Sequence, residues 1–298
     1  MFKREYHYLV AGLADLVFDS GKGVSDIAEF RRELELSLHP SDYSVVSILF
    51  LPHDNKNLMT YLEGSGKEWD TMGVYSLQDM EEQRRISESI LREDDILPPY
   101  MVEAIRNWFD SGSKNDRFET ERFLAEGYVD TALASGNRFL INYVRFDRDI
   151  KNINALINSK ALDLDAGNFI SGDYPLARRL REIFKSSRDF QIPPEPDYVP
   201  NMFRIMMEEE FLERERKIDI ARWDFINSDT FFEYFSVDWI MGYLIKLSIV
   251  TRWKQLDPET GKIMLRNLVE EMKPSADRAQ AAPEQENQDI DKTHIQTM

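Results

Sequence analysis

The sequence contains one glycine-rich segment, Gly64-Ser65-Gly66-Lys67, that resembles a phosphate-binding loop. The phosphate-loop motif needs a glycine five residues before its second glycine, and a Ser or Thr hydroxyl after its lysine to hold magnesium. Tyr61 and Glu68 occupy these two positions, and the Glu68 carboxylate would repel a phosphate. We therefore interpret the segment as an ordinary loop and predict no nucleotide site.

Other patterns for metal binding or catalysis are also incomplete. Asp163, Asp165 and Gly167 resemble the start of a calcium loop. The glycine is misplaced by one position, however, and Tyr174 stands where the bidentate Glu belongs. The four histidines do not occur in pairs at metal-ligand spacing. The sequence therefore predicts no catalytic, cofactor-binding or metal-ligating residues, and we expect a protein that is not an enzyme.

Composition limits the class of partner. The chain of 298 residues has 54 acidic and 37 basic side chains and a net charge of -17, which disfavours nucleic acids and anionic membranes because both bind clustered Lys and Arg. Cysteine is absent, which suits a reducing cytosol. Residues Met1–Leu13 lack the apolar run of an export signal, and the most apolar stretch, Trp239–Val250, is too short to cross a bilayer. We expect a cytoplasmic location without a membrane span.

The order of helix signals predicts an all-α protein. Asp26 with Glu29 has capping-box spacing, and Ser76 with Asp79 also marks a helix start. The segment Phe139–Ile157 has apolar residues three or four positions apart, and a long helix is predicted from Phe203 through Phe225. The only candidate strands, Tyr6–Val10 and Gly73–Tyr75, are too short for a sizeable sheet.

Proline positions suggest a division into lobes. Pro98-Pro99 ends one predicted helix and provides a start for the next. The four prolines at 193, 194, 196 and 200 block helix and mark the clearest boundary between lobes, and order is expected to be lost after Pro274. We therefore predict a first helical lobe at residues 1–97, a second at 98–192 and a third at 193–273. Residues 274–298 contain almost no large apolar side chains and are predicted to form a disordered acidic tail.

One short pattern occurs twice. Asp54-Asn55-Lys56-Asn57-Leu58 and Asp149-Ile150-Lys151-Asn152-Ile153 are 95 residues apart and share three identities. On a helix, the Asp and the Asn three residues later share a face, so one carboxylate and one amide are placed to fix a neighbouring segment. The alternatives are chance similarity and ordinary polar positions. The candidate lobe-stabilising residues are Asp54, Asn57, Asp149 and Asn152.

This acidic-x-x-Asn pattern in successive lobes resembles the family of V-type ATPase C subunits, known as d subunits in eukaryotes. Three further segments are similar to an uncharacterised bacterial family that is encoded beside V-type ATPase components: Tyr8–Leu13, Phe50 with Asp54–Leu58, and Tyr243–Trp253. The resemblance covers residues 1 to about 273. It implies a three-lobed helical funnel on the membrane rotor ring that receives the central shaft and transmits torque without chemistry of its own.

The third lobe departs from the pattern, because Leu247–Thr251 stand where this family usually repeats an acidic residue and Asn. The resemblance implies partners among the rotor-ring and central-shaft subunits, a position at the inner face of the membrane through protein contacts, no cofactor and no small-molecule substrate. Two alternatives are a helical adaptor or assembly factor of the same complex, and an enzyme that uses surface carboxylates with a divalent metal.

Overall fold

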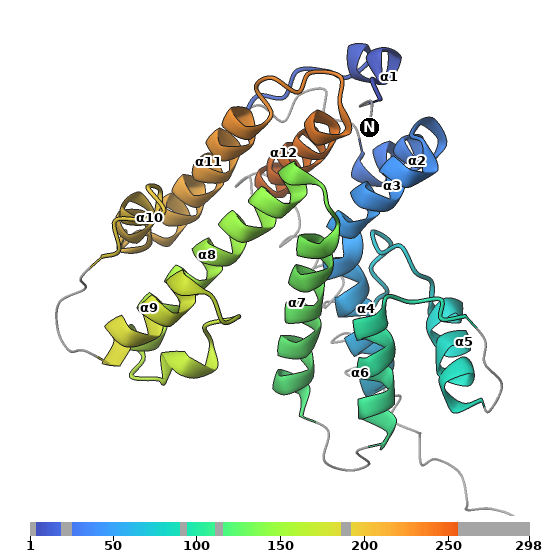
Figure 1. Ribbon diagram of the computed structural model, residues 1–298, viewed down its shortest axis with the longest axis horizontal. Helices are drawn as coiled ribbons and strands as arrows, with labels where there is room; N and C mark the ends of the chain where they lie inside the picture. The colour runs from blue at the N-terminus through green and yellow to red at the C-terminus, as the bar shows by residue number, and fades with distance from the viewer. Residues whose placement is uncertain (1–3, 19–25, 90–93, 111–115, 186–191, 256–298) are drawn as a thin grey trace, which may run out of the picture. The chain divides into compact units, whose positions relative to one another are not determined.

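The computed structural model describes residues 4–18, 26–89, 94–110, 116–185 and 192–255. Within these ranges the regular structure is helical and contains no β-strand, which confirms the predicted all-α class (Figure 1). The α-helices are α1 (His7–Ala11), α2 (Ile27–Ser37), α3 (Pro40–Ser47), α4 (Leu51–Glu63), α5 (Leu77–Glu88), α6 (Pro99–Asp110), α7 (Arg117–Ala134), α8 (Arg138–Ala161), α9 (Pro175–Lys185), α10 (Val199–Met206), α11 (Phe211–Asp229) and α12 (Val237–Gln255). Short 3-10 helices are η1 (Ile48–Phe50) and η3 (Ala166–Asn168).

The chain divides into two compact units, residues 1–250 and 251–298. The second unit is described only for its first five residues, at the end of α12. The predicted tail at 274–298 lies outside the described residues. All contacts discussed below belong to the first unit.

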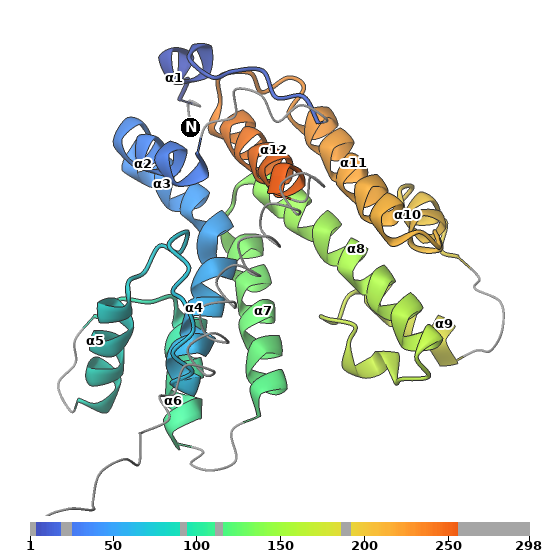
Figure 2. The ribbon, with the colours of Figure 1, turned by 180° about the vertical axis from the view of Figure 1, so that it is seen from behind.

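The first four-helix module, module A, consists of α4 to α7. The first helix of the module, α4, contacts each of the three that follow, and α4, α6 and α7 lie side by side in both views (Figures 1 and 2). Each helix buries a large apolar side chain in a common core, because its apolar residues recur on one face. These residues are Leu58, Met80, Met101 and Leu124.

The second four-helix module, module B, consists of α8 to α11 and repeats this arrangement. Its first helix, α8, contacts α9, α10 and α11, and it also contacts α7 of module A. A separate core contains Ile153, Leu180, Phe203 and Ile218, one from each helix. The repeated unit of this chain is therefore a set of four helices whose first member packs on the other three.

The two cores do not follow the predicted lobe boundaries. Leu97 and Tyr100 lie in the core of module A, on opposite sides of the predicted boundary at 97/98. Ile183 and Val199 likewise share the core of module B across the boundary at 192/193. Pro99 begins α6, a position where its missing N–H costs no hydrogen bond, so it marks a helix start within a module.

Two local predictions are wrong. The segment Tyr6–Val10, predicted as a possible strand, forms most of α1, and Gly73–Tyr75 lie in a loop. The long helix predicted from Phe203 through Phe225 is two helices, because the Glu210 side chain accepts a hydrogen bond from the Glu213 backbone N–H and caps α11. The helical spacing of apolar residues continues through this break, so the sequence pattern did not reveal that the helix ends there.

Within module A, Gly127 allows α7 to approach α6 closely. A Cβ at this position would lie 2.4 Å from the ring of Tyr100, so no larger residue fits without movement. The Tyr100 hydroxyl donates to Asn55 Oδ1 at 2.9 Å, and Asn55 Nδ2 donates to the Leu124 carbonyl at 3.0 Å. These contacts connect α4, α6 and α7. A glycine inside a helix destabilises it by about 1 kcal/mol relative to alanine, and the close approach of Tyr100 explains why Gly127 is nevertheless present in α7.

Candidate functional site

The four residues singled out by the repeated pattern all lie in the interior. Asp54 and Asn57 are on α4 and Asp149 and Asn152 are on α8, which is the first helix of the module in each case. None has more than 5% of its surface exposed. Buried polar groups of this kind need hydrogen-bond partners, because leaving one unpaired costs about 1 to 3 kcal/mol.

The two asparagines bind loop backbone in the same way. Asn57 Oδ1 accepts from the Asp70 N–H and its Nδ2 donates to the Asp70 carbonyl, both at 2.8 Å. Asn152 forms the same pair of bonds with Ser171, both at 2.9 Å. Each amide therefore holds one residue of the loop that connects the first helix of its module to the second.

An arginine holds the same loop in each module. Arg31 on α2 donates to the carbonyls of Met72 and Gly73 at 2.8 and 2.6 Å. Arg181 on α9 donates to the carbonyls of Ile170 and Gly172, at 2.7 and 2.8 Å. The two arginines come from different helices and from opposite sides of their loops in sequence, so no sequence pattern relates them.

The repeat also extends further than the pattern detected in sequence. Gly73-Val74-Tyr75 and Gly172-Asp173-Tyr174 follow the two motifs, each near the end of the loop that leads into the second helix of its module. A Cβ on Gly73 would lie only 2.5 Å from Asp54 Oδ1, so glycine is required for this approach. The Gly-x-Tyr signal is visible in the sequence, but it begins 19 residues after Asp54 and 23 after Asp149, and this unequal spacing hid it.

The two buried carboxylates differ in their partners. Asp54 Oδ1 accepts from the Tyr75 N–H at 2.9 Å, and burial raises the pKa of Asp54 to about 6. Asp149 accepts from the hydroxyls of Tyr174 and Tyr198, both at 2.6 Å. Burial also raises the pKa of Asp149, although the two hydroxyl hydrogen bonds oppose this shift. Both carboxylates thus bind groups of their own module.

Asp54→Asn is expected to change the pH dependence of stability. Because the pKa of Asp54 rises from 3.8 to about 6 on folding, the folded state binds more protons than the unfolded state between these values. The free energy of unfolding therefore falls as pH rises through this window, by about 3 kcal/mol for this group. Asparagine does not titrate, so the variant should gain this amount relative to the unmodified protein between pH 4 and pH 7.

Urea denaturation of both proteins at several pH values measures this difference. The result would contradict the assigned shift if the difference in unfolding free energy stayed constant from pH 4 to pH 7.

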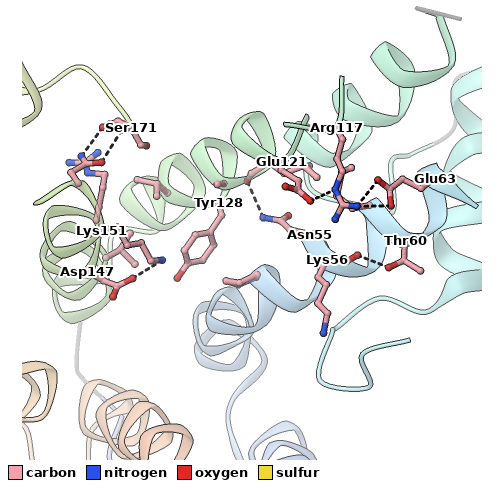
Figure 3. A pocket seen from close by; sticks show the side chains of 18 of the residues that line it. Asn55, Lys56, Thr60, Glu63, Arg117, Glu121, Tyr128, Asp147, Lys151 and Ser171 are labelled. Carbon is pink, nitrogen blue, oxygen red and sulfur yellow. Dashed lines mark hydrogen bonds and ion pairs between the residues drawn. The ribbon is translucent and has the colours of Figure 1, made fainter. Parts of the chain in front are cut away.

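A cavity of about 450 Å³ lies between α4, α7 and α8 (Figure 3). Its apolar lining includes Met59, Leu124, Val129 and Val144. The lysines of the two repeated motifs, Lys56 and Lys151, also line it. Each motif therefore uses its Asp and Asn to bind its own loop, whereas its Lys faces a space shared by both modules.

Ion pairs surround this cavity. Asp147 contacts Lys151 at 2.8 Å, and it also contacts Arg222 of α11 at 2.8 Å. Burial opposes ionisation of Asp147, but the charges of Arg222 and Lys151 outweigh it and hold the pKa of this carboxyl below its usual range. Across the cavity, Arg117 contacts Glu121 at 2.8 Å and Glu63 at 3.1 Å, as Figure 3 shows.

The other motifs considered in the sequence have local roles. Gly64 adopts a left-handed conformation that ends α4, which places Lys67 and Glu68 at the cavity. Asp165 accepts from the Gly167 N–H at 2.9 Å and caps η3. In the part of the chain that the structure describes, no group of three His, Asp or Glu side chains is placed to hold a metal ion.

The comparisons with known proteins identify a family. A family model described as "Protein of unknown function (DUF2764)" matches residues 3–276. The chain belongs to this family. Searches of the curated proteins and of the solved structures gave no match.

The region matched by the DUF2764 model contains both modules, both held loops and the cavity. Among the described helices of this DUF2764 protein, none combines the length and the apolar character needed to cross a bilayer.

Proposed function

We propose that the protein is a non-catalytic central-stalk component of a V-type ATPase or ATP synthase, which couples the rotor shaft to the membrane ring. The observation that carries the proposal is the Asp-x-Lys-Asn motif, which lies on the first helix of two successive helical modules and binds the following loop in each. This repetition supports the resemblance of the sequence to the V-type ATPase C subunits, in which an acidic-x-x-Asn pattern recurs in successive lobes.

The contacts of the motif residues favour a structural role for the motif in a scaffold protein. Its carboxylates and amides are buried and bind loop backbone or tyrosine hydroxyls within their own module, so their contribution is to the geometry of the modules. Repeated helical modules that contact their neighbours offer extended surfaces for binding other proteins. A protein that transmits torque needs such a stiff framework, and it binds the membrane machinery through protein contacts.

A group of exposed aromatic side chains supports the partner-binding part of the proposal. The aromatic loop, Thr230–Ser236 between α11 and α12, exposes 72% of Phe231, 91% of Phe232 and 60% of Tyr234. The loop is attached to the start of the chain, because the Tyr6 N–H donates to the Phe235 carbonyl at 2.8 Å. Exposed aromatic groups concentrated in one place mark protein contact surfaces, since aromatic residues dominate binding energy at interfaces. We assign the aromatic loop to contact with a rotor component.

Affinity purification of the tagged protein from native membranes in mild detergent, followed by mass spectrometry, tests this function. We expect rotor-ring and central-shaft subunits to be recovered in fixed ratio. The double variant Phe231→Ser/Phe232→Ser should reduce their recovery roughly tenfold without a change in melting temperature, because exposed side chains contribute to binding and little to folding.

Leu36→Ser and Leu162→Ser are matched controls, because they remove apolar side chains that are 87% and 68% exposed on other elements. Their recovery of partners should equal that of the unmodified protein. Purification of the protein alone, or with unrelated soluble proteins, would refute the coupling role.

A further inference from the structure

The cavity between α4, α7 and α8 differs in charge from the rest of the chain. Its lining contains five Lys or Arg side chains and four Asp or Glu, whereas the whole chain has 37 basic and 54 acidic side chains. The cavity lining therefore has a small excess of basic side chains, although the protein as a whole is strongly acidic. Its volume of about 450 Å³ falls within the range of roughly 300 to 1,000 Å³ that is typical of small-molecule sites.

Three of the four lining carboxylates already have cationic partners. Glu63 and Glu121 both pair with Arg117. Asp147 pairs with Arg222, which approaches from α11 and does not itself line the cavity. Arg222 also pairs with Asp219, so Arg222 and Lys151 together balance the two carboxylates. The Lys151 ammonium has three N–H donors and remains largely exposed, so it can still donate to a ligand.

The remaining cations are available to a ligand. Lys56 and Lys151 keep 70% and 68% of their side chains exposed, and Lys56 lies 3.5 Å from Asp70, its only carboxylate partner among the described residues. Within the described ranges, Lys67 has no ion-pair partner. Arg148 packs 3.7 Å from the Tyr174 ring centre, and its buried Nε has no hydrogen-bond partner in the described part of the chain.

Tyr128 supplies a polar group in the middle of the cavity. It projects from α7 into the space between α8, which carries Lys151, and α4, which carries Lys56 (Figure 3). Burial, together with the charge of Asp147, raises the pKa of Tyr128 well above its usual value, so its hydroxyl stays protonated. Among the described residues this hydroxyl has no hydrogen-bond partner, and it is therefore a donor for an anionic group.

We propose that this cavity binds an amphipathic organic anion, with its head group on Lys56, Lys151 and the Tyr128 hydroxyl and its apolar body on the Met59, Leu124 and Val129 side chains. The two lysines can bind one head group because the repeat places them on two helices that line the same cavity. Their charge-assisted hydrogen bonds favour an anion over a neutral group. The apolar lining adds affinity through burial of the ligand body. This site is independent of the proposed role in rotary coupling.

Isothermal titration calorimetry of the full chain with three probes separates the contributions of head and body. Decanoate has a carboxylate and an apolar chain, decyltrimethylammonium has the same chain with a positive head, and acetate has the head alone. We expect saturable binding of monomeric decanoate, no binding of decyltrimethylammonium, and at least roughly tenfold weaker binding of acetate.

Variants place the binding in the cavity. Lys56→Gln/Lys151→Gln should weaken decanoate binding at least roughly tenfold. Ala125→Trp should abolish it by filling the cavity from an exposed position on α7, whereas Ala134→Trp, on the same helix outside the lining, should leave it unchanged. The proposal is overturned if decanoate does not bind, if decyltrimethylammonium binds as tightly, or if Ala125→Trp with an unchanged melting temperature still binds decanoate.

Discussion

Arg222→Leu is expected to lower the free energy of unfolding by about 3 to 5 kcal/mol, because it leaves two largely buried carboxylates without their shared guanidinium. Arg222 on α11 contacts Asp147 on α8 at 2.8 Å and Asp219 on its own helix at 3.0 Å. The side chains of Arg222 and Asp219 are only 16% and 1% exposed, so water replaces little of the lost interaction.

The loss should depend on pH in a defined direction. Burial opposes ionisation of Asp147, but Arg222 and Lys151 hold its pKa in the folded protein below the usual value. A carboxyl whose pKa is lowered on folding stabilises the folded protein at pH values above its pKa in the unfolded state. This stabilisation is lost as the pH falls through the pKa of the folded state. The deficit of the variant should therefore be largest near neutral pH and become smaller below about pH 4.

Denaturation in urea at pH 7 and at low pH measures both effects. Arg179→Leu is the matched control, because Arg179 and Glu182 form an ion pair at 3.2 Å with the same three-residue spacing as Asp219 and Arg222. The side chains of Arg179 and Glu182 are 47% and 65% exposed. It should cost no more than about 0.5 kcal/mol, since exposed pairs contribute little. Equal losses for the two variants would contradict the role assigned to Arg222.

Asn152→Leu is expected to cost about 3 kcal/mol of unfolding free energy. The substitution removes the partners of the Ser171 N–H and carbonyl, and also a donor to the Tyr174 hydroxyl at 2.8 Å. Buried groups that lose their hydrogen bonds cost about 1 to 3 kcal/mol each, and partial movement of the loop toward water reduces the total. Asn57→Leu should produce a similar loss in module A, because Asn57 makes the equivalent pair of bonds.

Thermal and urea denaturation of both variants test the structural equivalence of the two motifs. Asn158→Leu provides a control on the same helix as Asn152, because Asn158 is exposed and its side chain donates, among the described residues, only to the Asn154 side chain. Its effect should stay within about 0.5 kcal/mol. An unchanged melting curve for Asn152→Leu, or a large loss for Asn158→Leu, would show that the amide does not hold the loop.

Sequence alone predicted the features of this fold that depend on neighbouring residues. Asp26 caps α2 through the Ala28 and Glu29 N–H groups, and Ser76 with Asp79 forms the capping box of α5, as their spacing indicates. The four motif residues were found because an Asp and an Asn three positions apart on a helix share one face. The loop segments that they hold were not predicted, because these lie 13 and 19 residues further along the chain.

Features that depend on packing between distant segments could not be predicted. The core of module A spans Pro98-Pro99 because Pro99 begins a helix instead of ending a lobe. Arg31 reaches its loop from about 40 residues earlier, whereas Arg181 reaches its loop from about 10 residues later, so no fixed spacing links them. The cavity likewise forms between three helices that are distant in sequence, so no local pattern predicted it.

The ratio of this protein to the central shaft in the intact complex is the most direct test of the proposed coupling role. Native mass spectrometry of the complex purified from membranes measures this ratio. A coupling role predicts an equimolar ratio to the shaft in the fully assembled, active complex. Absence of the protein from the active complex, with recovery only on incomplete assemblies, would contradict the account and favour the adaptor or assembly factor.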